Sequence, residues 1–277
     1  MIRVEWIRQV RRLRTWACLV ALAAVPVIIT VASYLDPPRG DRPFELNLFT
    51  ILTSSGINVG LISLLVMSQF FLIVVVAAFA GESISGEATW GTLRYLLVRP
   101  VSRARLVLAK LTIAYVLTLL AIAFIVGAGL VAGSIAFGWH DATFLRQVRV
   151  FNAQVPAPAV VPAGEAVLRL VLASGYVALT MLAVVAIGIF LSTLTDSTAA
   201  AVVGTVVVVV ASQVLGAVPS LDRIKPVLPT RYWDEWRNLF LGTSAFDMWK
   251  GVVSALAVTA LFTIAALWCF QRKDVLS

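Results

Sequence analysis

Long apolar runs separated by short polar segments dominate the pattern along this chain. A helix needs about 20 consecutive, mostly apolar residues to cross the hydrocarbon core of a bilayer. Six runs meet that length, and inside them the only charges are Lys110 and Arg169, each within one or two turns of an end. An open strand cannot satisfy its backbone in lipid, so we expect a helix even for the valine-rich Val202–Val210. The predicted spans are 16–35, 59–80, 106–137, 168–194, 198–218 and 251–270.

The basic residues predict an orientation for these spans. Lys and Arg are denser in the tail 1–15 and the loop 81–105 than in the longer segments on the opposite side. Cytoplasmic loops carry this excess, so both termini are expected in the cytoplasm. The chain is therefore predicted to be an all-α polytopic membrane protein with six transmembrane helices, forming a single domain over 1–277.

The first 15 residues alternate apolar and basic positions at helical spacing, with Ile2 and Val10 opposite Arg3. This pattern predicts an amphipathic helix over 1–15 that lies in the inner interface and leads into the first span. A plain positively charged anchor is one alternative. A signal peptide is another, which the long first run and the five later spans disfavour. The residues assigned to the interfacial helix are Trp6, Arg8, Arg11 and Arg12.

Two segments predicted on the side opposite the cytoplasm, 138–167 and 219–250, are expected to have different structures. The loop 138–167 ends in a proline-rich stretch that we expect to be loose. In 219–250, Thr230 is a candidate N-cap for an amphipathic helix with Trp233, Trp236 and Phe240 on one face. This segment is predicted to be a helical hairpin or re-entrant element in the outer leaflet, with a plain interfacial helix as the alternative.

Composition agrees with a membrane protein, since 60% of the residues are hydrophobic and 13% are charged. Soluble domains have roughly 45–50% apolar and about 25% charged residues. A soluble enzyme, a DNA-binding domain and a secreted disulfide scaffold are therefore excluded. The net charge of +8 comes from residues between the apolar runs, where Lys and Arg set topology and bind anionic headgroups. Cys18, Cys269 and the single His140 form no metal or disulfide motif.

The predicted spans contain few ionisable or polar residues that could bind an ion or catalyse a reaction. No ionisable residue is central in any run, which disfavours an ion-coupled transporter. Gln69 and Gln213 are expected to form interhelical hydrogen bonds. Gly129 and Gly133 form a small-residue face for helix packing, either within the chain or at a dimer seam. No P-loop occurs, so any energy from ATP would enter through a partner.

The loop 81–105 is the most informative segment. Glu82 and Glu87 border a Ser-Gly stretch expected to be a flexible turn, and an amphipathic helix is predicted over 88–98. Pro100 would end that helix, and Ser102 can cap the next one. A short surface helix of this kind suits insertion into a groove of another protein.

This loop resembles the corresponding segment of ABC-2 type permeases, the membrane subunits of type 2 ABC exporters. The bulky Trp90 and Tyr95 depart from the pattern, and no motif specifies the cargo. The matching positions are Glu87, Gly91-Thr92-Leu93, Leu96-Leu97, Pro100-Val101-Ser102-Arg103 and Lys110.

The resemblance implies a non-catalytic subunit of an ATP-driven exporter in the bacterial cytoplasmic (inner) membrane. It would form the translocation path with a second copy or a sibling permease, and a separate ATPase subunit would bind ATP and Mg²⁺. A scaffold that recruits a cytoplasmic partner, or a secondary transporter, are the alternatives. The residues implied in ATPase coupling are Glu82, Glu87, Gly91, Thr92, Leu93, Arg94, Leu96, Leu97, Arg99, Pro100 and Arg103.

Overall fold

The computed structural model describes residues 2–35, 48–89, 102–150, 153–221, 225, 228–241 and 248–272. Within these ranges, six helices are long and apolar enough to cross a membrane, which confirms an all-α polytopic membrane protein. The orientation of the helices stays a prediction. The six are α2 (Leu13–Leu35), α5 (Phe71–Thr89), α7 (Arg103–Phe137), α8 (Ala163–Leu194), α9 (Thr198–Ala217) and α11 (Met248–Arg272).

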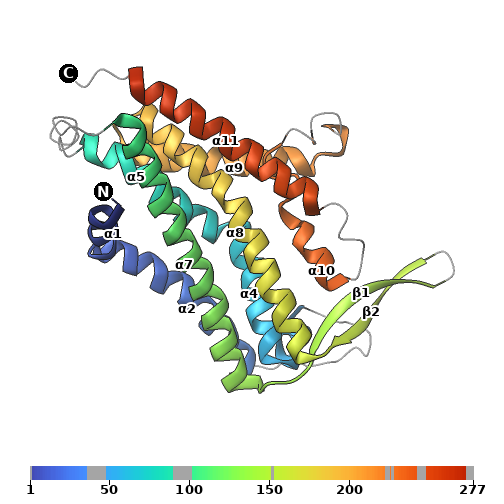
Figure 1. The fold of residues 1–277 in the computed structure, drawn as a ribbon. Helices are drawn as coiled ribbons and strands as arrows, with labels where there is room; N and C mark the ends of the chain where they lie inside the picture. The colour runs from blue at the N-terminus through green and yellow to red at the C-terminus, as the bar shows by residue number, and fades with distance from the viewer. Residues whose placement is uncertain are drawn as a thin grey trace.

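The helices form one bundle around α8, the most enclosed span, which packs against α5, α7, α9 and α11 (Figure 1). On the other side of the bundle, α7 packs against α2 and α4. With 35 and 32 residues, α7 and α8 are each about 50 Å long and exceed the hydrocarbon thickness of about 30 Å. The remaining elements are α1 (Ile2–Val10), α3 (Leu48–Ser54), α4 (Gly56–Gln69), β1 (Ala142–Val150), β2 (Ala153–Val161), η1 (Pro219–Leu221), η3 (Trp233–Arg237) and α10 (Asn238–Leu241).

The predicted span 59–80 is two helices rather than one. The break between α4 and α5 is at Phe70, whose φ of −144° and ψ of −56° leave the helical region. No proline causes it. The carbonyl oxygen of Gln69 instead accepts a hydrogen bond of 3.4 Å from the Gln213 amide of α9. The Gln69 amide donates in turn to Asp234 at 2.9 Å, so both glutamines are interhelical hydrogen-bond partners.

Close approach of α4 and α7 depends on glycine. A Cβ at Gly133 would lie 2.7 Å from the Gly56 carbonyl oxygen, and one at Gly129 would lie 2.9 Å from the Gly60 Cα. Both contacts are with backbone atoms, which cannot rotate away. The structure therefore places the Gly129–Gly133 face inside the chain, against α4.

The loop 138–167 is more ordered than predicted. Its backbone forms an antiparallel hairpin of β1 and β2, with Ala142 opposite Val161 and Leu145 opposite Pro158. In a two-stranded ribbon both strands are edges, so a proline without an N–H group can be accommodated. The prediction of a loose stretch is therefore wrong for the strand residues.

The segment before α11 also differs from the prediction. Thr230 does not cap an amphipathic α-helix, because η3 begins after Tyr232 and only one α-helical turn follows it. The Thr230 hydroxyl instead lies 2.8 Å from the Ser212 hydroxyl of α9. The predicted apolar face is present, since Trp233, Trp236 and Phe240 are all buried. Phe240 also packs against Phe144 of β1, with ring centroids 4.8 Å apart.

The N-terminal helix is shorter than predicted, and a turn at Arg11 and Arg12 separates α1 from α2. Its orientation also differs. Ile2 of the predicted apolar face is exposed, whereas Gln9 is buried and Glu5 is partly buried against the bundle. Trp6 does pack against the core. The surface of α1 that meets the protein is therefore largely polar.

The predicted flexible turn at 82–87 is helical, because α5 continues to Thr89. The hydroxyl groups of Ser83 and Ser85 donate to the carbonyl oxygens of Ala80 and Gly81 within the helix, at 2.7 and 2.6 Å. Serine side chains that bond back in this way are compatible with a helix interior. Of the predicted helix 88–98, positions 88 and 89 thus belong to α5, and 90–98 lie outside the described residues.

Candidate functional site

A buried ion-pair network lies where α1, α5 and α7 meet, close to both described ends of the predicted coupling loop. Lys110 of α7 is its most buried member, with a side chain that is 0% exposed. Its ammonium group has three acceptors, which matches its three N–H bonds. These are Glu87 Oε1 at 2.8 Å, the Ser83 carbonyl oxygen at 2.6 Å and Glu5 Oε1 at 3.3 Å.

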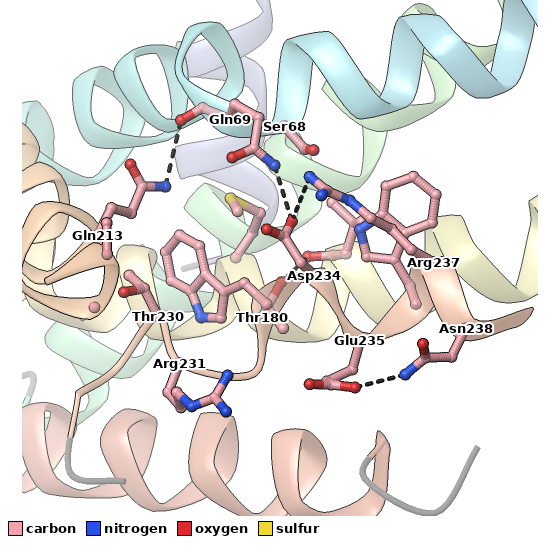
Figure 2. Close-up of a pocket in the computed structure, with 16 residues that line it drawn as sticks. Ser68, Gln69, Thr180, Gln213, Thr230, Arg231, Asp234, Glu235, Arg237 and Asn238 are labelled. Carbon is pink, nitrogen blue, oxygen red and sulfur yellow. Dashed lines mark hydrogen bonds and ion pairs between the residues drawn. The ribbon is translucent and has the colours of Figure 1, made fainter. Parts of the chain in front are cut away.

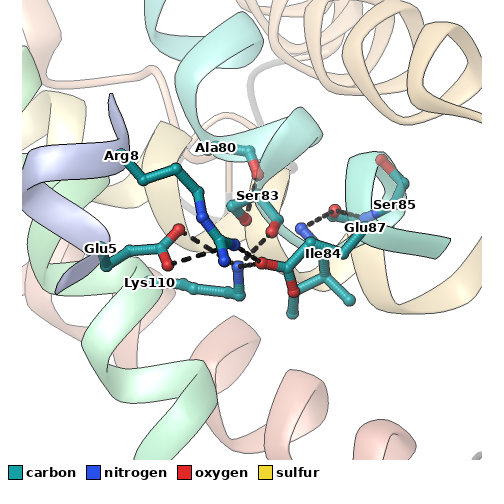
Figure 3. A network of polar contacts seen from close by, with 9 residues as sticks. Glu5, Arg8, Ala80, Ser83, Ile84, Ser85, Glu87 and Lys110 are labelled. Carbon is teal, nitrogen blue, oxygen red and sulfur yellow. Dashed lines mark hydrogen bonds and ion pairs between the residues drawn. The ribbon is translucent and has the colours of Figure 1, made fainter. Parts of the chain in front are cut away.

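Glu87 connects this lysine to the N-terminal helix. Its Oε1 atom also accepts a hydrogen bond from Arg8 Nη1 at 2.5 Å, and the Glu87 side chain is only 5% exposed. Arg8 lies 3.7 Å from Glu5 on the same helix. Figure 3 shows the four side chains converging from three helices. The two carboxylates balance the two cations, so the cluster as a whole has no net charge.

A second ion pair lies one to two turns earlier along α5. Arg14 of α2 contacts Glu82, whose side chain is 13% exposed. Glu82 and Glu87 were predicted to border a flexible turn and to orient a coupling helix after it. In the structure they join α5 to the first two helices of the chain instead.

Hydrogen bonds to α8 and α9 fix the other side of α5. The buried Ser192 hydroxyl accepts from the backbone N–H groups of Ile84 and Ser85, at 3.0 and 2.8 Å. At the end of the helix, the Thr89 hydroxyl donates to the Asp196 carbonyl oxygen at 2.6 Å. The last turn of α5 is thus held by α1, α7 and the turn between α8 and α9.

Arg103, the first residue of α7, connects the start of that helix to the end of α11. Its guanidinium donates to the carbonyl oxygens of Phe270 and Gln271 at 3.0 and 3.1 Å, near the end of α11. Carbonyl oxygens of a helix's last turn lack N–H donors within the helix, so a cation that donates to them is favourable. The role of Arg103 in ATPase coupling stays a prediction. Ser102 stands at the N-cap of α7, but its side chain forms no capping bond.

A cavity of about 740 Å³ opens beside the network. Three arginines line it together with Glu82 and Glu87. Of the residues assigned to the interfacial helix, Arg8 and Arg12 reach this cavity, whereas Arg11 is exposed. Within the described ranges, no three His, Cys, Asp or Glu side chains are grouped as metal ligands.

Most of the predicted coupling residues cannot be compared with the structure. They lie in 90–101, outside the described residues. These are Gly91, Thr92, Leu93, Arg94, Leu96, Leu97, Arg99 and Pro100.

Sequence reasoning assigned no role to Glu5, Arg14 or Ser192. Glu5 is the only acid among the first 15 residues and stands three positions before Arg8, which was a usable signal. Lys110 was matched only as part of a motif, although a lysine inside an apolar run requires a partner. Nothing in the sequence separates Ser192 from the many other serines of the spans.

The sequence matches the family described as ABC-2 family transporter protein over residues 1–275. This chain belongs to that family. No curated protein matches the sequence. Membership agrees with the six apolar helices and identifies the chain as a multi-pass membrane permease of the ABC transporter class.

Members of the ABC-2 family are membrane subunits rather than catalytic ones. They generally work with an ABC ATPase and often dimerise. The ion-pair network of this ABC-2 chain therefore lies beside the segment that the resemblance assigned to ATPase coupling.

Proposed function

We propose that this protein is the permease subunit of an ATP-driven exporter in the bacterial inner membrane. Two six-span subunits, identical or siblings, would form the translocation path. A separate cytoplasmic ATPase would bind ATP and Mg²⁺ and dock on the 81–105 segment. The end of the bundle that carries the ion-pair network would then face the cytoplasm.

The buried network is the observation that supports this proposal. Removing one partner of a buried ion pair lowers the stability of a protein by about 3–5 kcal/mol, so helices connected by such a pair tend to stay together. Lys110 and Glu87 join α7 to α5, and Arg8 adds α1. A partner that displaced residues 90–101 would consequently move all three helices together.

The helix break at Phe70 is the point at which α5 can bend during this movement. Beyond the break, α4 is packed tightly on α7 through the glycine contacts at Gly129 and Gly133. α5 can change its angle at Phe70 more easily than a continuous helix can bend, because the backbone there is already non-helical. The network end would thus move relative to the far end in response to the nucleotide state of the ATPase.

The test is affinity purification in mild detergent from the cells that naturally produce this protein, so that a partner ATPase is available to bind it. Native mass and vanadate-sensitive ATP turnover are read on the same eluate. We expect two permease chains with two ATPase subunits and vanadate-sensitive turnover. A permease that purifies alone, under conditions that preserve other such complexes, would contradict the proposal and favour a scaffold function.

A charge variant distinguishes binding of the ATPase from control of its ATP turnover by the permease. Lys110→Met removes the centre of the network, whereas Arg11→Gln removes an exposed charge at the same end of the molecule. We expect the first variant to bind the ATPase with ATP turnover no longer responsive to the permease. The control should behave like the unmodified protein. Equal turnover in both variants would mean that the network does not transmit the movement.

A further inference from the structure

A second cavity lies at the α4–α5 break, separate from the ion-pair network of the proposed ATPase coupling. Its volume is about 470 Å³, within the usual range for small-molecule sites of about 300–1,000 Å³. Four elements surround it, namely the end of α4, the middle of α8, the end of α9 and the η3 turn. Polar side chains predominate in its wall, including Gln69, Thr180, Gln213 and Asn238.

The depth of this cavity follows from helix geometry. Thr180 lies about 21 Å along α8 from Leu194, and Gln213 lies about 22 Å along α9 from Thr198. Leu194 and Thr198 flank the turn that holds the end of α5. With a hydrocarbon core of about 30 Å, the cavity belongs to the leaflet opposite the ion-pair network.

The cavity wall contains charged side chains of both signs, and only some of them form ion pairs with each other. Arg237 and Asp234 form an ion pair of 3.0 Å, to which Gln69 also donates (Figure 2). Glu235 has only the neutral Asn238 amide as its partner, at 2.6 Å. Arg231 stacks on Tyr232, with its guanidinium carbon 5.5 Å from the ring centre. Within the described chain, Glu235 and Arg231 have no partner of opposite charge.

Two buried donors in the same wall have no acceptor among the described residues. The indole N–H of Trp233 is one, in a side chain that is 8% exposed, and the Nε–H of Arg237 is the other. A buried N–H group without an acceptor costs about 1–3 kcal/mol. Both residues line the cavity, but these two N–H groups are covered by protein atoms, so the wall has this cost whether or not a ligand is bound.

We infer that this cavity binds a zwitterionic group, with an anionic phosphate or carboxylate beside an ammonium. The anionic end would pair with the exposed guanidinium of Arg231. The ammonium end would pair with Glu235. A ligand with a net charge fits less well, because the two arginines and two carboxylates of the wall already balance. A phospholipid headgroup and a free zwitterionic solute share this chemistry.

The test uses delipidated protein in detergent and native mass spectrometry with short-chain lipids. We expect dioctanoyl phosphatidylethanolamine to bind about tenfold more tightly than dioctanoyl phosphatidylglycerol, which lacks the ammonium group. Adding free phosphoethanolamine distinguishes the two sources, since displacement of the lipid indicates that the headgroup alone suffices. Equal binding of the two lipids, or no saturable binding of either, would overturn the inference.

Two substitutions assign the binding to this cavity. Glu235→Gln should lower phosphatidylethanolamine affinity by about tenfold and reverse the preference toward the anionic lipid, because a charge-assisted hydrogen bond is lost. Arg231→Gln should weaken both lipids. Glu165→Gln and Arg11→Gln, which make the same charge changes away from the cavity, serve as controls. The thermal unfolding midpoint of each variant verifies that it is folded, and unchanged binding in both cavity variants would contradict the assignment.

Discussion

Lys110 Nζ and Glu87 Oε1 lie 2.8 Å apart, although Glu87 is predicted within the cytoplasmic loop 81–105 and Lys110 near the start of the next span. Their side chains are 0% and 5% exposed, so the pair is a core contact between α7 and α5. The carboxylate is shared with Arg8 of the N-terminal helix. The segment that resembles an ATPase-coupling loop is thus anchored in the bundle by charge.

Lys110→Met is expected to destabilise the protein by about 3–5 kcal/mol, because it leaves the carboxylates of Glu5 and Glu87 with one cation between them. The measurement is the thermal unfolding midpoint in detergent. Arg11→Gln is the matched control, with an expected change within about 0.5 kcal/mol. A Lys110→Met protein as stable as the control would show that the buried pair is not required.

Removing both members of the pair should cost less than the two single losses together. Lys110→Met with Glu87→Leu restores the charge balance and leaves Arg8 with Glu5 as its partner. Contacting residues of this kind show coupling energies of about 0.5–3 kcal/mol in double-mutant cycles. Strict additivity of the two single effects, measured in the same unfolding assay, would argue against a direct interaction.

The packing of α4 on α7 should tolerate no side chain at Gly133. Gly133→Ala places a Cβ against the Gly56 carbonyl oxygen, and overpacking of this kind costs about 1–3 kcal/mol. Gly127→Ala on the same helix meets nothing within 4 Å and should be neutral or stabilising. The readout is the fraction of monodisperse protein after heating. The opposite ranking would place the contact face elsewhere.

Ser192→Ala is expected to destabilise the last turns of α5, because two backbone N–H groups lose a shared acceptor. The expected cost is about 1–3 kcal/mol. Ser174→Ala is the comparison, since the Ser174 hydroxyl bonds only within its own helix, to the Leu170 carbonyl oxygen. Amide hydrogen exchange over 80–89 measures the effect. Protection of that segment unchanged from the unmodified protein would contradict this role for Ser192.

Much of the fold followed from the apolar runs, because a span must bury about 20 residues in lipid whatever it packs against. Five of the six predicted runs match single helices to within a few residues. The span 59–80 could not be divided from sequence, since its break at Phe70 contains no glycine or proline. That break accompanies a hydrogen bond from Gln213, more than 140 residues away.

The candidate site, like the fold, could be predicted from the sequence only in part. The sequence alone is enough to predict a six-span membrane protein and to show that the 81–105 segment resembles ABC-2 permeases. The packing of α1, α5 and α7 is needed to show that Glu87 and Arg8 contact Lys110 rather than lie at a solvated surface. Periodicity reports which side of a helix is apolar, whereas the partner of a buried charge depends on how helices distant in the chain pack.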